Sequence, residues 1–167
     1  MLDLKNATTQ QVAMEAFFFG YQAFTAKADE MLDRRGLSRV HQRIVFFIAR
    51  YPGLSVKELQ GVLGVSKQAL NTPLRQLIEM ELVQGVTAEN DKRKRLLDLT
   101  TEGALLETSL RREQVRLLRR VFADVGLEAV DGWLTVNQAL GKTLQSVSRP
   151  RAPTSSTLPL DELAQQT

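Results

Sequence analysis

Glycine and serine at positions 53–66 divide the middle of the chain into short helical segments. The residues Ser55-Val56-Lys57-Glu58 fit a capping box, in which the serine and glutamate side chains bond the unpaired backbone N–H groups of a helix start. Gly64 ends this helix after about two turns, and Ser66 can cap a second one. The segment therefore predicts a short helix, a turn that contains glycine, and a second helix.

The second of these helices has an apolar side and a polar side. Leucines at 70, 74 and 77 recur at helical spacing on the apolar side. After the capping Ser66, the opposite side carries basic, amide and hydroxyl residues: Lys67, Gln68, Asn71, Thr72 and Arg75. Amides can pair with an adenine edge and arginine or lysine with guanine, so the pattern is that of a DNA-binding helix-turn-helix. A solvated helix can carry the same residues, and this face alone does not separate the two interpretations.

Pro73 interrupts the polar-faced helix. It lacks the N–H that would bond to the Ala69 carbonyl, so we expect a bend at this position.

A β-hairpin with a basic tip is predicted next. Residues 82–86 are β-prone, and residues 97–99 alternate as a half-buried strand does. The polar stretch between them ends in four consecutive cations: Lys92, Arg93, Lys94 and Arg95. Alone, such a run would indicate a solvated loop. Beside a helix-turn-helix, the same charges can reach phosphates or a minor groove, and the whole segment describes a winged helix.

The hairpin and the residues after it resemble the wing signature of the MarR-type regulators. That signature reads D-R-R, three to four residues, then L-T-x-x-G, and the chain has Asp91-Lys92-Arg93 followed by Leu99-Thr-Thr-Glu-Gly103. Residues 54–59 and 65–70 look like the helix-turn-helix of the same family, so the resemblance covers about 37–103. It implies that Asp91 braces an arginine and that Arg93 reaches the minor groove. Lys92 replaces the usual arginine, which keeps the charge but loses planar, two-bond donation.

The resemblance also implies an assembly and a mode of action. A homodimer would read a pseudo-palindrome in double-stranded DNA, with one winged helix-turn-helix in each subunit. It would act as a repressor that a small aromatic or lipophilic effector releases.

The expected fold class is mainly α with a small β-hairpin wing, in which dimerisation helices flank the winged helix-turn-helix. We expect an N-terminal dimerisation helix in 1–36, the DNA-binding unit in 37–103 and C-terminal dimerisation helices in 104–147. A flexible tail over 148–167 holds three of the five prolines. Two helical segments have a wider apolar surface than the single stripe that one neighbouring helix would bury: Phe17-Phe18-Phe19 and the apolar face within 130–147. This indicates that a second copy of the protein covers them. The alternative is that both belong to an intramolecular core.

The net charge is +3, and two arginine groups stand out from it. Arg39 and Arg43 lie near the DNA-binding unit in sequence and are candidates for phosphate contacts. For the arginines of 111–120 we prefer a solvated helix face or salt bridges with a partner.

Composition excludes several other functions. The chain has no cysteine, which excludes thiol chemistry and thiolate zinc sites, and its single histidine disfavours histidine-rich metal sites. We therefore expect no cofactor, no metal and no enzyme activity. The longest apolar run, 44–49, is too short to cross a membrane, and 1–5 has no secretory pattern, so a cytoplasmic protein is expected.

Two further hypotheses concern partners. A winged helix can also serve as a protein-interaction module without sequence-specific DNA binding, but such a module would expose aromatic and aliphatic residues where this chain has cations and amides. An effector pocket could lie between the helical and winged parts, lined by Phe17, Tyr21, Phe24, His41 and Phe46. The alternative is that these side chains are simply core.

Overall fold

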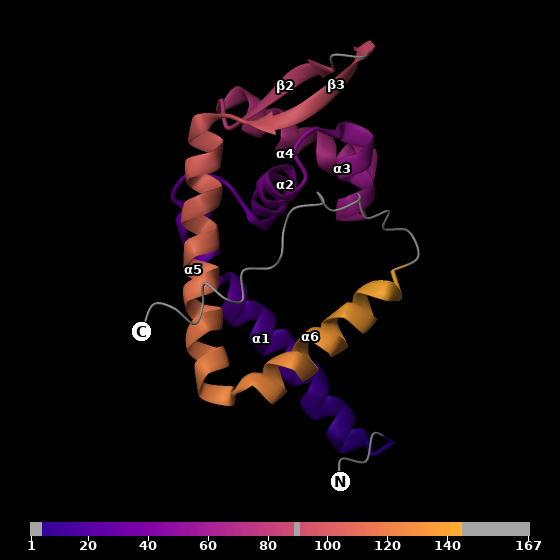
Figure 1. Ribbon diagram of the computed structural model, residues 1–167, viewed down its shortest axis with the longest axis vertical. Helices are drawn as coiled ribbons and strands as arrows, with labels where there is room; N and C mark the ends of the chain where they lie inside the picture. The colour runs from indigo at the N-terminus through magenta and orange to yellow at the C-terminus, as the bar shows by residue number, and fades with distance from the viewer. Residues whose placement is uncertain (1–4, 89–90, 145–167) are drawn as a thin grey trace.

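The computed structural model describes residues 5–88 and 91–144, with the backbone alone for 88 and 91–94 (Figure 1). Most of this part of the chain is helical. The elements in chain order are α1 (Ala7–Asp33), α2 (Arg39–Arg50), β1 (Leu54–Ser55), α3 (Val56–Leu63), α4 (Lys67–Glu79), β2 (Val83–Ala88), β3 (Asp91–Leu99), α5 (Thr101–Val125) and α6 (Leu127–Lys142). The predicted tail over 148–167 lies outside the described residues.

The long helix α5 joins two unlike parts of the molecule (Figure 1). At one end lie α2, α3, α4 and the hairpin of β2 and β3; at the other end the chain turns into α6. The helix α1 packs against both α5 and α2. This arrangement is the mainly α, winged fold that the sequence predicts. Within the described residues, no helix has the length and apolarity that crossing a bilayer requires.

The sheet is antiparallel and has the strand order β1-β3-β2. Val83 pairs with Leu99 and Thr87 with Arg95, and the register shifts between Thr87 and Ala88 toward the hairpin tip. The two-residue strand β1, which has no local signal in the sequence, pairs Leu54 with Leu97. It fastens the start of α3 to the base of the wing.

The helix starts around the central turn are capped as predicted. Ser55 Oγ accepts from the backbone N–H of Glu58 at 3.3 Å, and Glu58 Oε2 accepts from the N–H of Ser55 at 2.8 Å. Ser66 Oγ accepts from the N–H of Ala69 at 3.1 Å. Gly64 ends α3 with φ of 63°, a conformation that favours glycine. These local choices fix where α4 begins.

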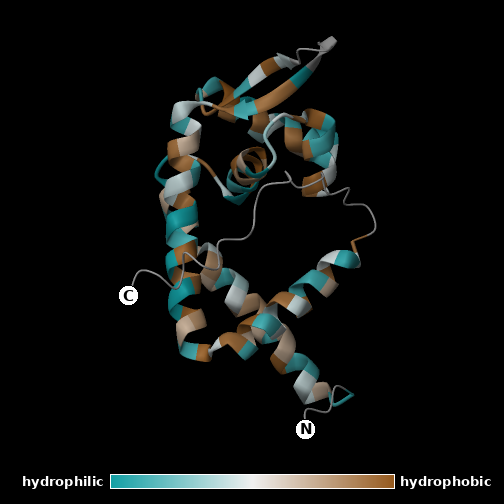
Figure 2. Cartoon of the chain, in the orientation of Figure 1, coloured by the Kyte–Doolittle hydropathy of each residue, from teal (hydrophilic) through white to brown (hydrophobic). Residues whose placement is uncertain are grey.

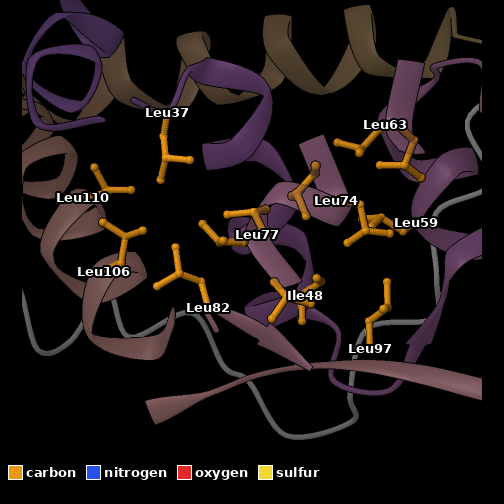
Figure 3. Packing of buried hydrophobic residues seen from close by; sticks show 14 of the residues in the cluster. Leu37, Ile48, Leu59, Leu63, Leu74, Leu77, Leu82, Leu97, Leu106 and Leu110 are labelled. Atoms are coloured by element: carbon orange, nitrogen blue, oxygen red, sulfur yellow. The ribbon is translucent and has the colours of Figure 1, made fainter. Parts of the chain in front are cut away.

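One apolar core holds the winged part together and anchors it to α5 (Figure 3). Ile48 of α2, Leu59 of α3 and Leu77 of α4 are fully buried in it. Leu97 of β3 and Leu110 of α5 extend the same cluster to the sheet and to the long helix. Burial of these side chains, at about 1.5–3 kcal/mol each, sets the position of α4 against its neighbours.

The end of the wing is tied to the start of α5 by Thr100. Its Oγ1 accepts from the N–H of Gly103 at 3.0 Å and donates to the Glu81 carbonyl at 2.6 Å. Thr100 is therefore both the cap of α5 and a link to the turn after α4. These contacts give a physical reason for the threonine of the L-T-x-x-G motif.

Candidate nucleic-acid interface

The helix α4 presents the polar face that the sequence predicts. Its leucines at 70, 74 and 77 are buried in the core, which turns the opposite side of the helix outward. That side, which we call the recognition face, consists of exposed residues: Lys67, Gln68, Asn71, Thr72 and Arg75. A helix exposed along one polar side, with three amide or hydroxyl groups and two cations, has the donors and acceptors that base edges and phosphates require.

Arg75 of α4 and Ser66, which caps the helix, have other interactions. Arg75 lies 3.6 Å from Glu79, an exposed pair of the kind that contributes little and can exchange for a phosphate. Ser66 uses its oxygen as the cap of α4, so it stands at a helix N-terminus, where backbone N–H groups favour anions.

Pro73 does not end α4, which continues as one helix from Lys67 to Glu79. The proline is buried on the inner side of the helix. Its ring therefore packs with the core and leaves the recognition face intact.

The wing is only partly described. The backbone of Asp91, Lys92, Arg93 and Lys94 forms the start of β3, while their side chains lie outside the described residues. Arg95 is exposed, and its Nε lies 3.3 Å from the place where a Cβ on Gly85 would stand. The absence of a side chain at 85 thus leaves room for this guanidinium across the strand pair.

Arg39 and Arg43 are held within the fold. The Arg39 Nε donates to both carboxylate oxygens of Asp29, at 2.8 and 3.0 Å, and its guanidinium lies over the Tyr21 ring. The hydrogen bond to Asp29 raises the pKa of Arg39. Arg43 donates to the Leu63 carbonyl at the end of α3, at 2.9 Å. Both contacts tie α2 to a neighbouring helix, and a role of these arginines in phosphate binding stays a prediction.

His41 is buried at the start of α2 with both ring nitrogens bonded. Nδ1 accepts from the N–H of Ser38, and Nε2 lies 3.0 Å from Oε1 of Gln76 on α4. Burial lowers the pKa of His41, an effect that the hydrogen bond to Gln76 partly opposes. His41 therefore links the start of α2 to α4 through its hydrogen bonds. Its partner Gln76 has no local signal in the sequence.

The effector pocket lined by Phe17, Tyr21, Phe24, His41 and Phe46 stays a prediction. Phe17 and Tyr21 are exposed on α1, whereas His41 is buried at the start of α2. Phe46 borders a cavity of about 10 Å³ between α2 and α5, which has room for about one water molecule. An effector the size of an aromatic acid would not fit there.

A larger hollow of about 420 Å³ lies along α5. Its described lining is Thr108, Arg111, Arg112, Val115, Arg116 and Arg119. Two of these arginines have partners on the same helix, Arg111 with the buried Glu107 at 3.2 Å and Arg116 with Glu113 at 3.1 Å. Salt bridges within α5 thus account for part of the charge of 111–120. Within the described residues, no group of three or more histidine, cysteine, aspartate or glutamate side chains could hold a metal ion.

Comparison with known proteins decides the family. The model of the MarR family matches residues 35–94, which include the helix-turn-helix and most of the wing. The HTH-type transcriptional regulator PetP of Rhodobacter capsulatus is 44% identical over 127 residues, which is 76% of this chain and 76% of PetP. The chain belongs to the MarR family. As a MarR-family protein it is a transcriptional regulator with a DNA-binding winged helix, a class whose members in general are not enzymes.

Solved structures of the MarR family share this fold. Streptococcus pneumoniae FabT in complex with DNA has a TM-score of 0.69 at 17% identity, covering 83% of this chain and 99% of its own. Staphylococcus aureus MarR in complex with salicylate and kanamycin has a TM-score of 0.65 at 20% identity, covering 81% and 95%. At these identities the likeness shows the fold alone.

Proposed function

We propose that this MarR-family chain is a homodimeric, sequence-specific repressor that binds a pseudo-palindromic operator and responds to a small effector. The observation that carries the homodimer is the surface of α6. None of its described residues, Leu127–Lys142, is buried, although it carries large apolar side chains on successive turns: Trp133, Val136 and Leu140. A helix with such a surface needs cover from another chain.

The N-terminal half of α1 supports the same proposal. Phe17, Phe18 and Phe19 are all more than half exposed. Colouring by hydropathy shows further apolar residues along α6 (Figure 2). The N-terminal half of α1 and the start of α6 both lie toward the end of the molecule that is away from the hairpin (Figure 1). A two-fold axis there would pair identical surfaces and leave both winged parts free.

The residues of the recognition face support sequence-specific recognition of DNA bases. In a two-fold dimer, the two copies of α4 would enter successive major grooves about 34 Å apart. The wing cations, Lys92 to Arg95, would then reach the neighbouring minor groove or its phosphates. FabT, whose fold is similar, was solved in complex with DNA. Repression follows if the operator overlaps a promoter.

The effector proposal rests on the hollow along α5. Its arginines favour an acidic ligand, and its apolar part, Val115, leaves room for an aromatic ring. The similar MarR of Staphylococcus aureus was solved with salicylate, an aromatic acid. A thermal shift with salicylate that disappears in Arg112→Ala would support this site, and an unchanged shift in that variant would contradict it.

Selection of bound sequences from a random duplex pool tests the main proposal. With purified protein at near-physiological salt, we expect enrichment of one inverted repeat, and light scattering is expected to give twice the chain mass. Binding to all sequences alike would contradict sequence-specific regulation. Absence of binding would favour a protein-interaction module. If the dimer neutralises about 6–10 phosphates, affinity falls by roughly 10³–10⁵ between 50 and 200 mM salt.

A further inference from the structure

Gln76 lies on α4 but off the recognition face, close to the end of the helix at Glu79. Its side chain reaches back toward the segment that joins α1 to α2. The amide nitrogen donates to the Gly36 carbonyl at 3.2 Å, and Oε1 lies 3.0 Å from Nε2 of His41. These partners are 40 and 35 residues away along the chain. One side chain therefore joins the recognition helix to the α1–α2 connection and to the first turn of α2.

The hydrogen-bond directions in this cluster are mutually consistent. The N–H of Ser38 donates to Nδ1 of His41 at 3.0 Å, so the ring proton is on Nε2. That proton is donated to Oε1 of Gln76, and the amide nitrogen then faces Gly36. His41 is only 7% exposed, so water has little access to replace a lost partner. A movement of α4 that broke the bond to His41 would leave a buried ring nitrogen unpaired, whereas the Gly36 carbonyl is exposed and can bond water instead.

The apolar contacts of α4 pack the helix against the core. Leu74 and Leu77 belong to the same core cluster as Ile48 and Leu37 (Figure 3). The buried leucines of α4 set its separation from the core and turn the recognition face outward. Hydrogen bonds weaken steeply when their angles change. The two bonds of Gln76 add an angle-dependent restraint near the C-terminal end of α4.

A small tilt of α4 would matter for DNA binding. Lys67 lies about nine residues before Gln76, which is about 14 Å along a helix. A tilt of about 10° around the Gln76 end would move the Lys67 end by about 2 Å. Hydrogen bonds to base edges tolerate only a few tenths of an ångström, so the contacts at that end would be lost.

We propose that Gln76 is a positioning residue, which sets the orientation of α4 relative to α1 and α2 through its bonds to Gly36 and His41. The inference rests on the homodimer proposed above. In that dimer the orientation of each α4 determines the spacing between the two recognition helices. Gln76 therefore determines how strictly the protein selects the distance between operator half-sites.

The test compares Gln76→Met with Leu74→Met. The first keeps the side-chain size but removes both hydrogen bonds; the second disturbs the buried side of α4 and leaves the bonds in place. Dissociation constants are measured for the selected operator and for the same operator with one base pair inserted between its half-sites. Wild type and Leu74→Met are expected to lose about tenfold or more on insertion, and Gln76→Met less than about threefold. Gln76→Glu keeps the acceptor for His41, and we expect an intermediate loss.

A spectroscopic measurement tests the geometry directly. Because His41 is the single histidine of the chain, its ring nitrogens give one unambiguous pair of NMR signals. The expected spectrum has the proton on Nε2 and none on Nδ1. A proton on Nδ1 would overturn the proposed network, and so would equal insertion losses in Gln76→Met and Leu74→Met. A wild type that is monomeric or prefers no inverted repeat would overturn the homodimeric function as well as this inference.

Discussion

The backbone of Gly103 in α5 lies against the carbonyl of Leu82, so that a Cβ on Gly103 would stand 1.9 Å from the Leu82 oxygen. The same carbonyl accepts from the N–H of Thr100 at 3.2 Å. The start of α5 and the turn before β2 are therefore in direct backbone contact. This contact requires glycine at the last position of the L-T-x-x-G motif, because any side chain would separate the two segments.

Gly103→Ala is therefore expected to destabilise the protein strongly, by about 3 kcal/mol or more, since backbone rather than a flexible side chain must move. Urea unfolding followed by circular dichroism measures the loss. Gly132→Ala in α6 is the matched control, because among the described residues no heavy atom lies within 4 Å of its added Cβ. Helix propensity predicts that this control gains up to about 1 kcal/mol. Equal stabilities of the two variants would contradict the packing argument.

Glu81 follows α4 with φ of 56°, the left-handed conformation that costs a non-glycine residue about 1–2 kcal/mol. Glu81→Gly should relieve this strain and stabilise the fold by up to about 1 kcal/mol, because the entropy of glycine in the unfolded chain offsets part of the gain. The Glu81 carbonyl, which accepts from Thr100 Oγ1, is retained. Thermal unfolding of the two proteins measures the difference, and a lower midpoint in Glu81→Gly would show that its side chain has a further role.

The sequence predicts the elements whose signals are local and misses contacts between distant residues. Capping serines at 55 and 66 and the left-handed Gly64 mark helix boundaries, because each acts within a few residues. The amphipathic pattern of α4 correctly predicts its exposed face. The bonds of Gln76 to Gly36 and His41 have no such signal, since any glutamine on a helix would look the same. The two-residue strand β1 is missed for the same reason, because it exists only through pairing with β3.

The residues predicted to bind phosphate or an effector also depend on contacts between distant parts of the chain, which the sequence does not show. Arg39 carries a charge that suits DNA, but its pairing with Asp29, ten positions earlier, depends on how α1 and α2 pack. Phe17 and Phe46 are aromatic, and aromatic side chains are common in the lining of ligand pockets. The structure places Phe17 on α1 and Phe46 on α2, so a pocket shared by them depends on how these helices pack and stays a prediction.

Stability is expected to depend on pH through His41. Its pKa is lowered by burial, so the unfolded chain, with a pKa near 6.5, takes up a proton before the folded protein does. The contribution of the neutral ring is thus fully present above about pH 6.5 and declines as the pH falls below that value. Protonation of Nδ1 would also break its bond from the N–H of Ser38. Urea midpoints should therefore decrease between pH 7 and 5.

His41→Gln is the variant that isolates this effect. Glutamine is a usual partner in a capping box, so it can accept from Ser38 in place of Nδ1 without titrating. We expect the urea midpoint of the variant to change less than that of wild type between pH 7 and 5. The same decrease in both proteins would assign the pH dependence to carboxylates instead.

Phe18→Glu should convert the proposed dimer to a monomer without unfolding the chain. Phe18 is 64% exposed in the single chain, so its replacement removes no core contact there but places a charge on the surface that a second copy would cover. Light scattering measures the mass, and circular dichroism checks that the helices remain. Lys57→Glu on α3, an exposed change of charge far along the chain from α1, is expected to leave the mass at that of a dimer. A dimeric Phe18→Glu would exclude this part of α1 from the interface.

Asn71→Ala tests the assignment of the recognition face. Asn71 is exposed near the middle of α4, and alanine is the better helix former, so the fold should not be affected. Loss of a bidentate amide contact is expected to relax discrimination at one or a few base positions by about 1–3 kcal/mol. Arg93→Ala in the wing provides the contrast, since loss of a backbone or minor-groove cation should weaken binding to all sequences nearly alike. Selection from a random duplex pool with each variant measures both effects. If Asn71→Ala enriches the same repeat with the same preference at every position, then this side of α4 does not read the bases.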